Sequence, residues 1–235
     1  SDSDGTLIEN VIVKTNVRYE GSSTDATCGG FFANMEAKVT LRNCAFLGSI
    51  DTGTAEGNGG LVGWAGSGAS MNIINCYVAP TKYTKNGNSH DFARHVPTIT
   101  NSYYIDADNS AKLASGELCY MLNGKTSGGK NWFQNLGAGG DSHPVPFSSH
   151  GTVYLNGSYC CDGVTPKLGA DVKYANVEER YVDEHTFGEN DLCSGCMAAG
   201  LEPGKKDGVY QIGNCGEFVW FASHVNGGNG SADAV

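Results

Sequence analysis

The chain has 235 residues, a formal net charge of −10, 34 glycines and nine cysteines. Glycine is about twice as frequent as usual and charged residues are scarce, which favours short strands and tight turns over long helices. The negative charge argues against binding to nucleic acid or to an anionic membrane, and no apolar stretch is long enough to cross a bilayer. Because the chain lacks an initiator methionine, we expect a piece of a longer protein whose signal peptide and anchor lie outside it.

The first half of the chain repeats a short pattern in which an apolar or β-branched run leads to an asparagine. The four segments are LIENVIVKTNV, VTLRNCAFLGSI, MNIINCYVAP and TITNSYYIDA, with Asn10, Asn43, Asn75 and Asn101 at the shared position. Strand, turn and strand at intervals of about 30 residues predict a parallel β-helix (a β-solenoid), because stacked coils share the core that one coil lacks. The crossover preference of parallel strands predicts a right-handed coil. In such a stack the four asparagines should form a ladder of side-chain hydrogen bonds.

Two cysteines follow the repeated asparagine directly. Cys44 and Cys76 occupy the same position of neighbouring repeats, so they should stack. We expect them to be buried as small apolar residues, with a disulfide between adjacent coils as the alternative.

Two of the repeats also open with paired glycines, at residues 29–46 and 59–78. The second stretch, GGLVGWAGSGASMNIINCYV, resembles the GLUG motif, with its core at residues 60–63, Gly-Leu-Val-Gly. In the first stretch, Phe-Phe-Ala at residues 31–33 replaces Leu-Val-Gly. The motif recurs in large bacterial surface proteins, IgA-specific peptidases among them. The resemblance therefore implies an extracellular or bacterial cell-surface location.

Residues 79–98 interrupt the pattern with a polar, proline-bounded stretch that contains His90, Asp91 and His95. It predicts a solvated loop that projects from the repeats, with a metal or ligand contact as the alternative.

A short acidic stretch further along the chain, YYIDADNS, carries Asp106, Asp108 and Asn109 and resembles part of a calcium loop. The glycine and the bidentate glutamate of such a loop are absent, so we expect a surface turn.

The repeats are expected to end in a short helical cap. Residues 111–125 predict one helix whose start Ser115 can cap and in which Cys119 is buried. Trp132 and Phe133 then predict an aromatic plug over the last coil; a sugar-stacking platform is the alternative. The whole segment is similar to one that ends GLUG-like repeat blocks, and this resemblance implies a C-terminal cap.

From about residue 156 charged residues become more frequent, and four of the nine cysteines fall within a stretch of 37 residues. One CxxC pair, an upstream histidine and a further cysteine could complete a tetrahedral zinc site in a segment with little core of its own. The predicted ligands are Cys161, His185, Cys193 and Cys196, with Cys160 as an alternative to Cys161. Disulfides and free thiols are the alternatives to this structural zinc. A thioredoxin-like role is disfavoured, because the motif does not lie between a strand and a helix.

The last residues predict the start of a further repeat block. A short strand leads to a helix that Asn214 and Glu217 can begin as a capping box, and Cys215 in its first turn is expected to be buried. We therefore divide the chain into a β-solenoid with its cap at 1–155, a cysteine-rich linker module at 156–204 and a second block at 205–235.

No GxSxG, HExxH or P-loop pattern occurs in the chain. We therefore expect a non-catalytic surface segment that serves as an adhesin stalk or as a scaffold for a host protein or glycan ligand. An accessory β-helix region of a surface peptidase or of a polysaccharide-acting enzyme is the alternative, and a purely structural spacer is a third. No catalytic residue and no cofactor other than the structural zinc is predicted.

Overall fold

The computed structural model describes residues 5–87, 89–94, 97–159, 172–182, 187–188, 192–193 and 202–225. Strands predominate and those of the repeats pair in parallel, which confirms the expected mainly β class. The chain divides into two compact units. The first comprises Ser1–Leu155 and Tyr174–Val177, and the second comprises Asn156–Lys173 and Glu178–Val235.

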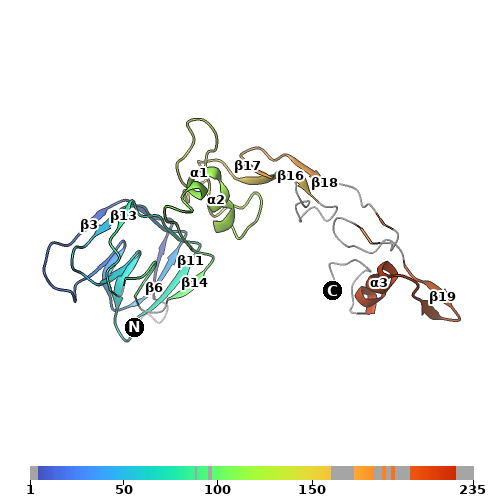
Figure 1. Cartoon of the computed structure of the whole chain (residues 1–235), viewed down its shortest axis with the longest axis horizontal. Helices are drawn as coiled ribbons and strands as arrows, with labels where there is room; N and C mark the ends of the chain where they lie inside the picture. Colours follow the sequence, from blue (N-terminus) through green and yellow to red (C-terminus); the bar gives the residue numbers. More distant parts are fainter. Residues whose placement is uncertain are drawn as a thin grey trace. The chain divides into compact units, whose positions relative to one another are not determined.

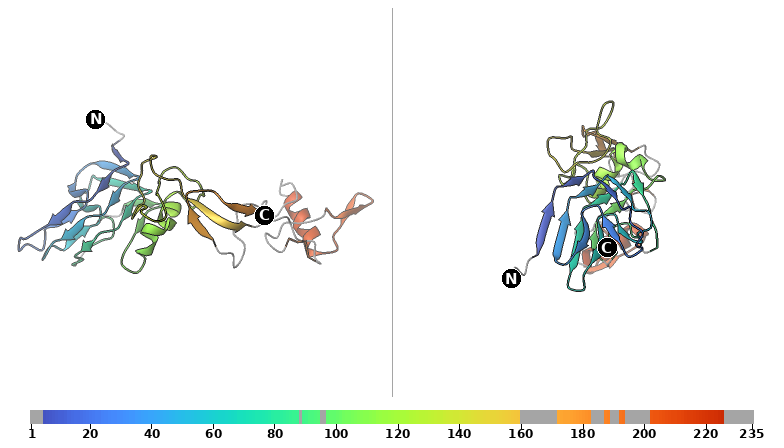
Figure 2. Two further views of the ribbon diagram at one scale, coloured as in Figure 1. Left: turned by 90° about the horizontal axis from the view of Figure 1, so that it is seen from above. Right: turned by 90° about the vertical axis from the view of Figure 1, so that its left-hand side faces the viewer.

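The first unit contains the repeats, whose strands lie side by side in the order of the sequence (Figures 1 and 2). Its first sheet consists of β1 (Thr6–Glu9), β6 (Lys38–Arg42), β11 (Ser70–Ile74) and β14 (Thr98–Thr100). Each strand pairs in parallel with the equivalent strand of the neighbouring repeat. Alternate side chains of β6 and β11 are buried, as the period of a strand with one face on the core requires.

Two further parallel sheets follow the asparagine turns. One consists of β2 (Ile12–Val13), β7 (Ala45–Phe46), β12 (Tyr77–Val78) and β15 (Tyr103–Tyr104). The other consists of β3 (Asn16–Arg18), β8 (Ser49–Asp51) and β13 (Lys82–Tyr83). Each sheet therefore takes one strand from each successive repeat.

The paired glycines lie between two shorter strand pairs. β4 (Thr27–Gly29) pairs with β9 (Gly57–Gly59), and β5 (Phe32–Met35) pairs with β10 (Val62–Ala65), both in parallel. The two GLUG-like stretches are thus structurally equivalent and stacked in register.

Residues 89–94 continue this stack, and β13 at residues 82–83 pairs with β8, so the expectation that 79–98 projects as a loop is wrong for both parts. His90 forms a parallel bridge to Gly59, and Ala93 forms one to Val62. Ala93 is buried in the core, whereas the side chain of His90 is exposed. The polar composition of the segment hid its main-chain pairing, which does not depend on side-chain type.

The four asparagines form the expected ladder. All four are left-handed, with φ between 45° and 59°, a conformation that asparagine adopts more readily than most residues. The Nδ2 of each later residue donates to the Oδ1 of the one before it, at 3.1 Å for Asn43 to Asn10, 3.3 Å for Asn75 to Asn43 and 3.0 Å for Asn101 to Asn75. Asn101 Nδ2 also donates to the main-chain oxygen of Leu122 at 2.8 Å, so the ladder ends against the cap.

Cys44 and Cys76 are free and fully buried, which confirms their expected role in the core. The Cys44 main-chain N–H donates to Cys76 Sγ at 3.4 Å, and each thiol lies 3.2 Å from a main-chain oxygen two residues earlier. The two cysteines therefore act as small stacked residues of the interior.

The predicted single cap helix consists of two short ones, α1 (Ala111–Ser115) and α2 (Glu117–Leu122). They are separated by Gly116, whose φ of 88° no helix can contain. As predicted, Cys119 is fully buried, and Ser115 Oγ accepts the main-chain N–H of Glu117 at 3.2 Å. Gly116 thus ends the first helix and directly precedes the second, whose first residue bonds to the Ser115 hydroxyl.

The second unit has few described elements. The C-terminal half of β16 (Tyr154–Tyr159) pairs in parallel with β18 (Arg180–Val182), and β17 spans Lys173–Ala175. β19 (Gly204–Lys206) and β20 (Val209–Gln211) form an antiparallel hairpin. The Asp-Gly pair that joins them has positive φ at both residues, as a tight hairpin turn requires.

The helix α3 (Cys215–Val225) begins at the predicted cap, because Asn214 Oδ1 accepts the main-chain N–H of Glu217 at 2.8 Å. The Glu217 carboxylate in turn accepts the N–H of Gly213. Cys215 is exposed, so its expected burial is wrong; the first turn of α3 presents it to solvent.

Candidate functional site: a polar pocket around Trp64

A pocket of about 290 Å³ lies beside the β5–β10 pair in the first unit. Trp64 and Asn34 are register partners in these parallel strands, so their side chains project from the same face of the sheet. Trp64 is half-buried, and Asn34 is exposed. The pocket is lined by Asp25, Thr27, Asn34, Trp64 and Arg94.

Thr27 holds the amide of Asn34 in place. Its Oγ1 lies 2.9 Å from Asn34 Oδ1 and 3.2 Å from the main-chain oxygen of Ala33, and it can donate its proton to either. Because Oδ1 accepts this contact, the Nδ2 protons of Asn34 are the amide's donors toward a ligand.

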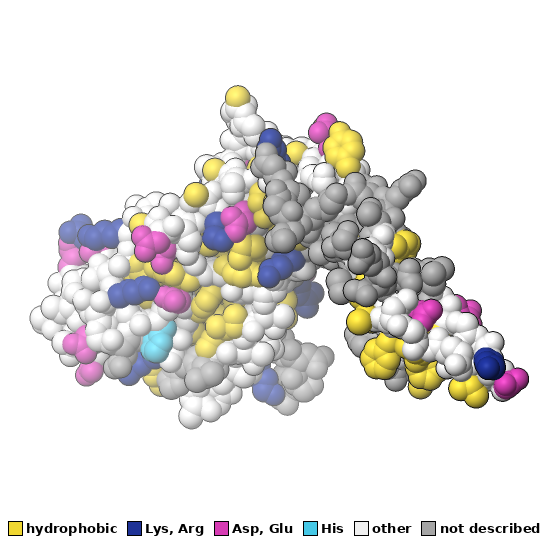
Figure 3. Space-filling model, turned by 45° about the vertical axis from the view of Figure 1, so that its right-hand side comes forward, with side chains coloured by type: hydrophobic (Ala, Val, Ile, Leu, Met, Phe, Trp, Pro, Cys, Tyr) yellow, Lys and Arg dark blue, Asp and Glu magenta, His cyan; other side chains and the backbone are white. Residues whose placement is uncertain are grey.

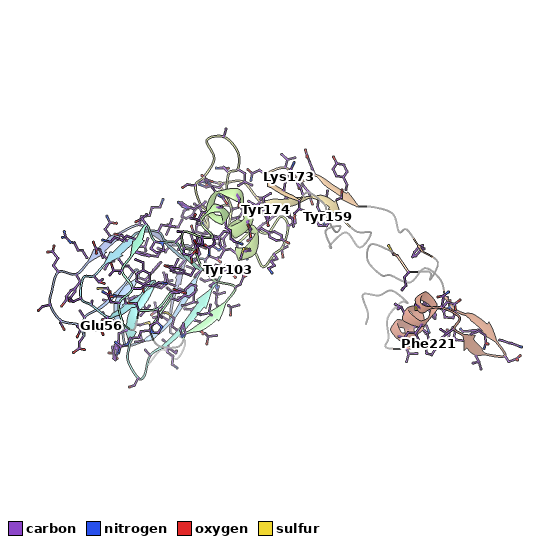
Figure 4. All side chains as sticks on the ribbon, viewed as in Figure 1. Glu56, Tyr103, Tyr159, Lys173, Tyr174 and Phe221 are labelled. Atoms are coloured by element: carbon purple, nitrogen blue, oxygen red, sulfur yellow. The ribbon has the colours of Figure 1, made fainter. Side chains whose placement is uncertain are left out.

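Arg94 reaches the pocket from the segment that continues the stack. The main-chain oxygen of Phe92 accepts the N–H groups of Leu61 and Val62, at 2.8 and 3.0 Å, which anchors this segment to the glycine turn. A Cβ at Gly57 would lie only 2.9 Å from Arg94 Nη1 and 2.8 Å from Thr27 Cγ2. Gly57 therefore leaves the space in which the guanidinium lies. Glu56, which precedes it, is labelled in Figure 4 on the side of the repeats away from the cap.

These groups combine an aromatic side chain with several directional polar groups around a space of small-molecule size. An indole supplies apolar area, a guanidinium and an amide supply donors, and a carboxylate supplies acceptors. Asp25 is the one carboxylate among the described residues of the lining, so these residues lack the paired carboxylates of most glycosidases.

A second hollow of about 320 Å³ lies between the Ala79–Tyr83 stretch and the start of the cap. Its cations are already paired within the protein. Lys82 Nζ lies 2.7 Å from Asp51, and the neighbouring Lys85 pairs with Asp91 while its Nζ lies 4.1 Å from the Tyr104 ring centroid. These contacts hold the last repeats together.

Three of the four predicted zinc ligands, Cys161, His185 and Cys196, lie outside the described residues, as does the alternative Cys160. Cys193 is buried and forms an antiparallel bridge with Phe187. Elsewhere in the described part of the chain, no group of three or more histidine, cysteine or acidic side chains could hold a metal ion. The zinc site stays a prediction.

The acidic stretch of the last repeat is a turn held by its own side chains. Asp106 Oδ1 accepts the main-chain N–H groups of Asp108 and Asn109, at 3.1 and 3.2 Å. Asn109 Oδ1 accepts the N–H of Asp106 at 3.0 Å. These oxygens are engaged with the main chain, which confirms the predicted surface turn. The other loop candidate, His95, lies outside the described residues.

Trp132 and Phe133 form the predicted plug. Trp132 is fully buried and Phe133 is 8% exposed, so neither ring offers a face to a sugar. The buried thiols of Cys76 and Cys119 are equally unsuited to chemistry. Burial raises the pKa of Cys119 to about 12, and contact with Cys44 together with burial raises the pKa of Cys76. A thiol that stays protonated at neutral pH is a poor nucleophile.

The sequence did not single out the Trp64 pocket, although one signal was present. Aligning the two paired-glycine openings places Trp64 opposite Asn34, at a position that faces away from the core. Asp25 comes from an irregular segment, and Arg94 follows the polar stretch that pairs through its main chain, so no periodic pattern could have placed them beside the indole.

Within the described residues, no helix has the length and apolarity that crossing a membrane requires. Comparisons with protein-family models, with curated proteins and with solved structures found no match to this chain.

Proposed function

We propose that the stacked repeats form a short right-handed β-solenoid closed by the α1–α2 cap, in a GLUG-like segment of a bacterial surface protein. Parallel pairing between equivalent strands and the in-line asparagine ladder support this architecture. Handedness follows from the crossover preference of parallel strands. An extracellular location is part of the proposal and rests on the resemblance of residues 59–78 to the motif.

On this scaffold we propose a non-catalytic glycan-binding role, and the observation that carries it is the Trp64 pocket. A half-buried indole bordered by an amide, a hydroxyl, a carboxylate and a guanidinium offers what a pyranose ring needs. The ring stacks through its C–H face, and its hydroxyls take up directional hydrogen bonds. Four of the five lining residues come from strands or from a segment paired with them, so the site is largely preformed.

The test is a glycan array with the purified chain, followed by calorimetry on the glycans that bind. Trp64→Ala should weaken binding at least about tenfold, equivalent to 1.4 kcal/mol, because it removes the stacking face. Phe147→Ala, which removes an exposed aromatic side chain of the same unit, is the matched control and should bind normally. Binding that survives Trp64→Ala would refute the site, and an array without any signal would leave only the spacer role.

A further inference from the structure

We propose that the ligand of the Trp64 pocket is a carboxylated sugar, a uronate or a sialate, whose carboxylate pairs with Arg94. The inference rests on the proposed glycan-binding function and specifies its ligand class. It comes from the state of Arg94, the one cation among the described residues that line the pocket.

Arg94 is half-buried, yet it makes no hydrogen bond or ion pair with any described residue. The other arginines of the repeats differ. Arg18 pairs with Glu20 at 2.6 Å, and Arg42 pairs with Glu9 at 3.3 Å. Acidic and basic side chains lie beside each other over this unit in Figure 3 as well. A guanidinium that is partly removed from water without an anion is a costly arrangement, which an anionic ligand would relieve.

The position of the guanidinium suits a planar anion. Gly57 leaves the space for it, and the anchored main chain at Phe92 fixes where the side chain starts. A guanidinium binds a carboxylate through two parallel N–H···O bonds, which is stronger and more directional than a contact to a neutral hydroxyl. Asn34 and Asp25 then remain for the sugar hydroxyls, as donor and as acceptor.

The overall charge makes this contact necessary for an acidic ligand. With a net charge of −10, the chain repels anions at long range. A carboxylated sugar therefore needs a local cation at the site, and preference for such a sugar should depend on Arg94 rather than on the surface as a whole.

The experiment compares matched ligands by calorimetry on the full chain. One pair is trigalacturonate and its neutral galactose trisaccharide; the other is sialyllactose and lactose. The wild type should bind the acidic member of at least one pair tenfold or more tighter, and the pair that shows this separates uronate from sialate. Arg94→Gln should abolish the preference while Lys38→Gln, which removes an exposed cation from β6, should keep it.

Each outcome has one meaning. Equal affinity for both members of each pair, with binding still lost in Trp64→Ala, overturns the carboxylate inference and leaves glycan binding intact. A preference for acidic sugars that persists in Arg94→Gln overturns the assignment to Arg94. Failure of all four ligands and of a wider glycan array overturns the proposed function itself. Far-UV circular dichroism of each variant shows whether it is folded.

Discussion

Trp132 Nε1 donates a 2.8 Å hydrogen bond to the main-chain oxygen of Asn75. The indole is fully buried and meets the ring of Tyr77 edge-on, with the ring centroids 5.1 Å apart. Asn75 is a member of the asparagine ladder, so a single hydrogen bond joins the segment after the cap helices to the turn of the third repeat. The cap is thus held by a directional contact as well as by apolar packing.

We predict that Trp132→Phe lowers the free energy of unfolding by about 1–3 kcal/mol, because the variant loses this bond and leaves a buried oxygen without its donor. Trp132→Ala should cost about 3–5 kcal/mol through the cavity it creates. Urea unfolding followed by circular dichroism measures both. Phe147→Leu, at an exposed position, should change little. An unchanged midpoint for Trp132→Phe would show that the bond does not stabilise the cap.

The ladder predicts a difference between two substitutions of Asn43. Its φ is 50°, and its side chain both donates to Asn10 and accepts from Asn75. Asn43→Gly loses only the hydrogen bonds, whereas Asn43→Ala also pays about 1–2 kcal/mol for a left-handed backbone. Alanine should therefore be the more destabilising by about that amount in urea unfolding. Equal losses for the two variants would mean that the left-handed backbone contributes nothing to the cost.

We predict that the protein loses part of its free energy of unfolding in mild acid because His143 becomes protonated. Its Nε2 lies 3.2 Å from Lys14 Nζ, and its Nδ1 lies 3.2 Å from Tyr77 Oη and 3.0 Å from the Pro144 oxygen. Burial lowers the pKa of His143 below its ordinary 6.5, the hydrogen bond to the Pro144 oxygen partly opposes this, and the charge of Lys14 lowers the pKa further. The folded state therefore favours the neutral ring. This contribution to stability is complete above pH 6.5 and is lost as the pH falls through the lowered folded pKa.

Urea midpoints between pH 7.5 and 4.5 measure this effect, and an NMR titration of His143 measures its pKa directly. His143→Gln should make the urea midpoint depend less on pH in this range. Lys14→Met should make the loss smaller, because removing the facing positive charge raises the folded pKa of the imidazole toward its unfolded value. A profile unchanged in His143→Gln would contradict this assignment of the acid loss to His143.

Gly57→Ala should disturb the Trp64 pocket with little effect on folding. The added methyl meets Arg94 Nη1 at 2.9 Å and Thr27 Cγ2 at 2.8 Å. The long arginine side chain can turn aside, whereas a shift of the β-branched Thr27 disturbs its contact with Asn34. The φ of Gly57 is not positive, so alanine adds no left-handed strain there. We expect the urea midpoint to stay near that of the wild type while affinity for the pocket's ligand drops several-fold. A large loss of stability with intact binding would contradict this picture.

Zinc binding by the cysteine-rich linker is a prediction from the sequence alone. If Cys161, His185, Cys193 and Cys196 bind zinc, the purified chain should contain about one zinc ion, which a chelator removes. Elemental analysis and thiol titration before and after chelation separate this from disulfides, which would show no metal and fewer titratable thiols. The single variant Cys196→Ser should lose the metal, whereas Cys119→Ala in the cap should retain it.

The repeated asparagine was the most informative sequence feature. It placed the turns, predicted their ladder and fixed which cysteines stack, because one residue type in one unusual backbone conformation recurs at the same step of each repeat. The capping box at Asn214 and Glu217 was equally local and equally predictable. Both features depend on residues close in sequence or on an exact structural repeat.

What escaped prediction depends on longer-range structure. The pairing of His90 and Ala93 uses main-chain groups, and polar side chains concealed it. Gly116 divides the cap helix because its backbone is left-handed, whereas an isolated glycine in a helical pattern is often tolerated. The Trp64 pocket joins residues from four separate segments, so its composition became visible only once the stack brought them together.

The four buried cysteines of the first unit, Cys28, Cys44, Cys76 and Cys119, all retain free thiols. This unit therefore needs no oxidant to mature and has no cross-link among them that a reductant could cut. The stability of this unit should therefore be the same under oxidising and under reducing conditions. Sensitivity of the chain to such surroundings would have to reside in its other cysteines.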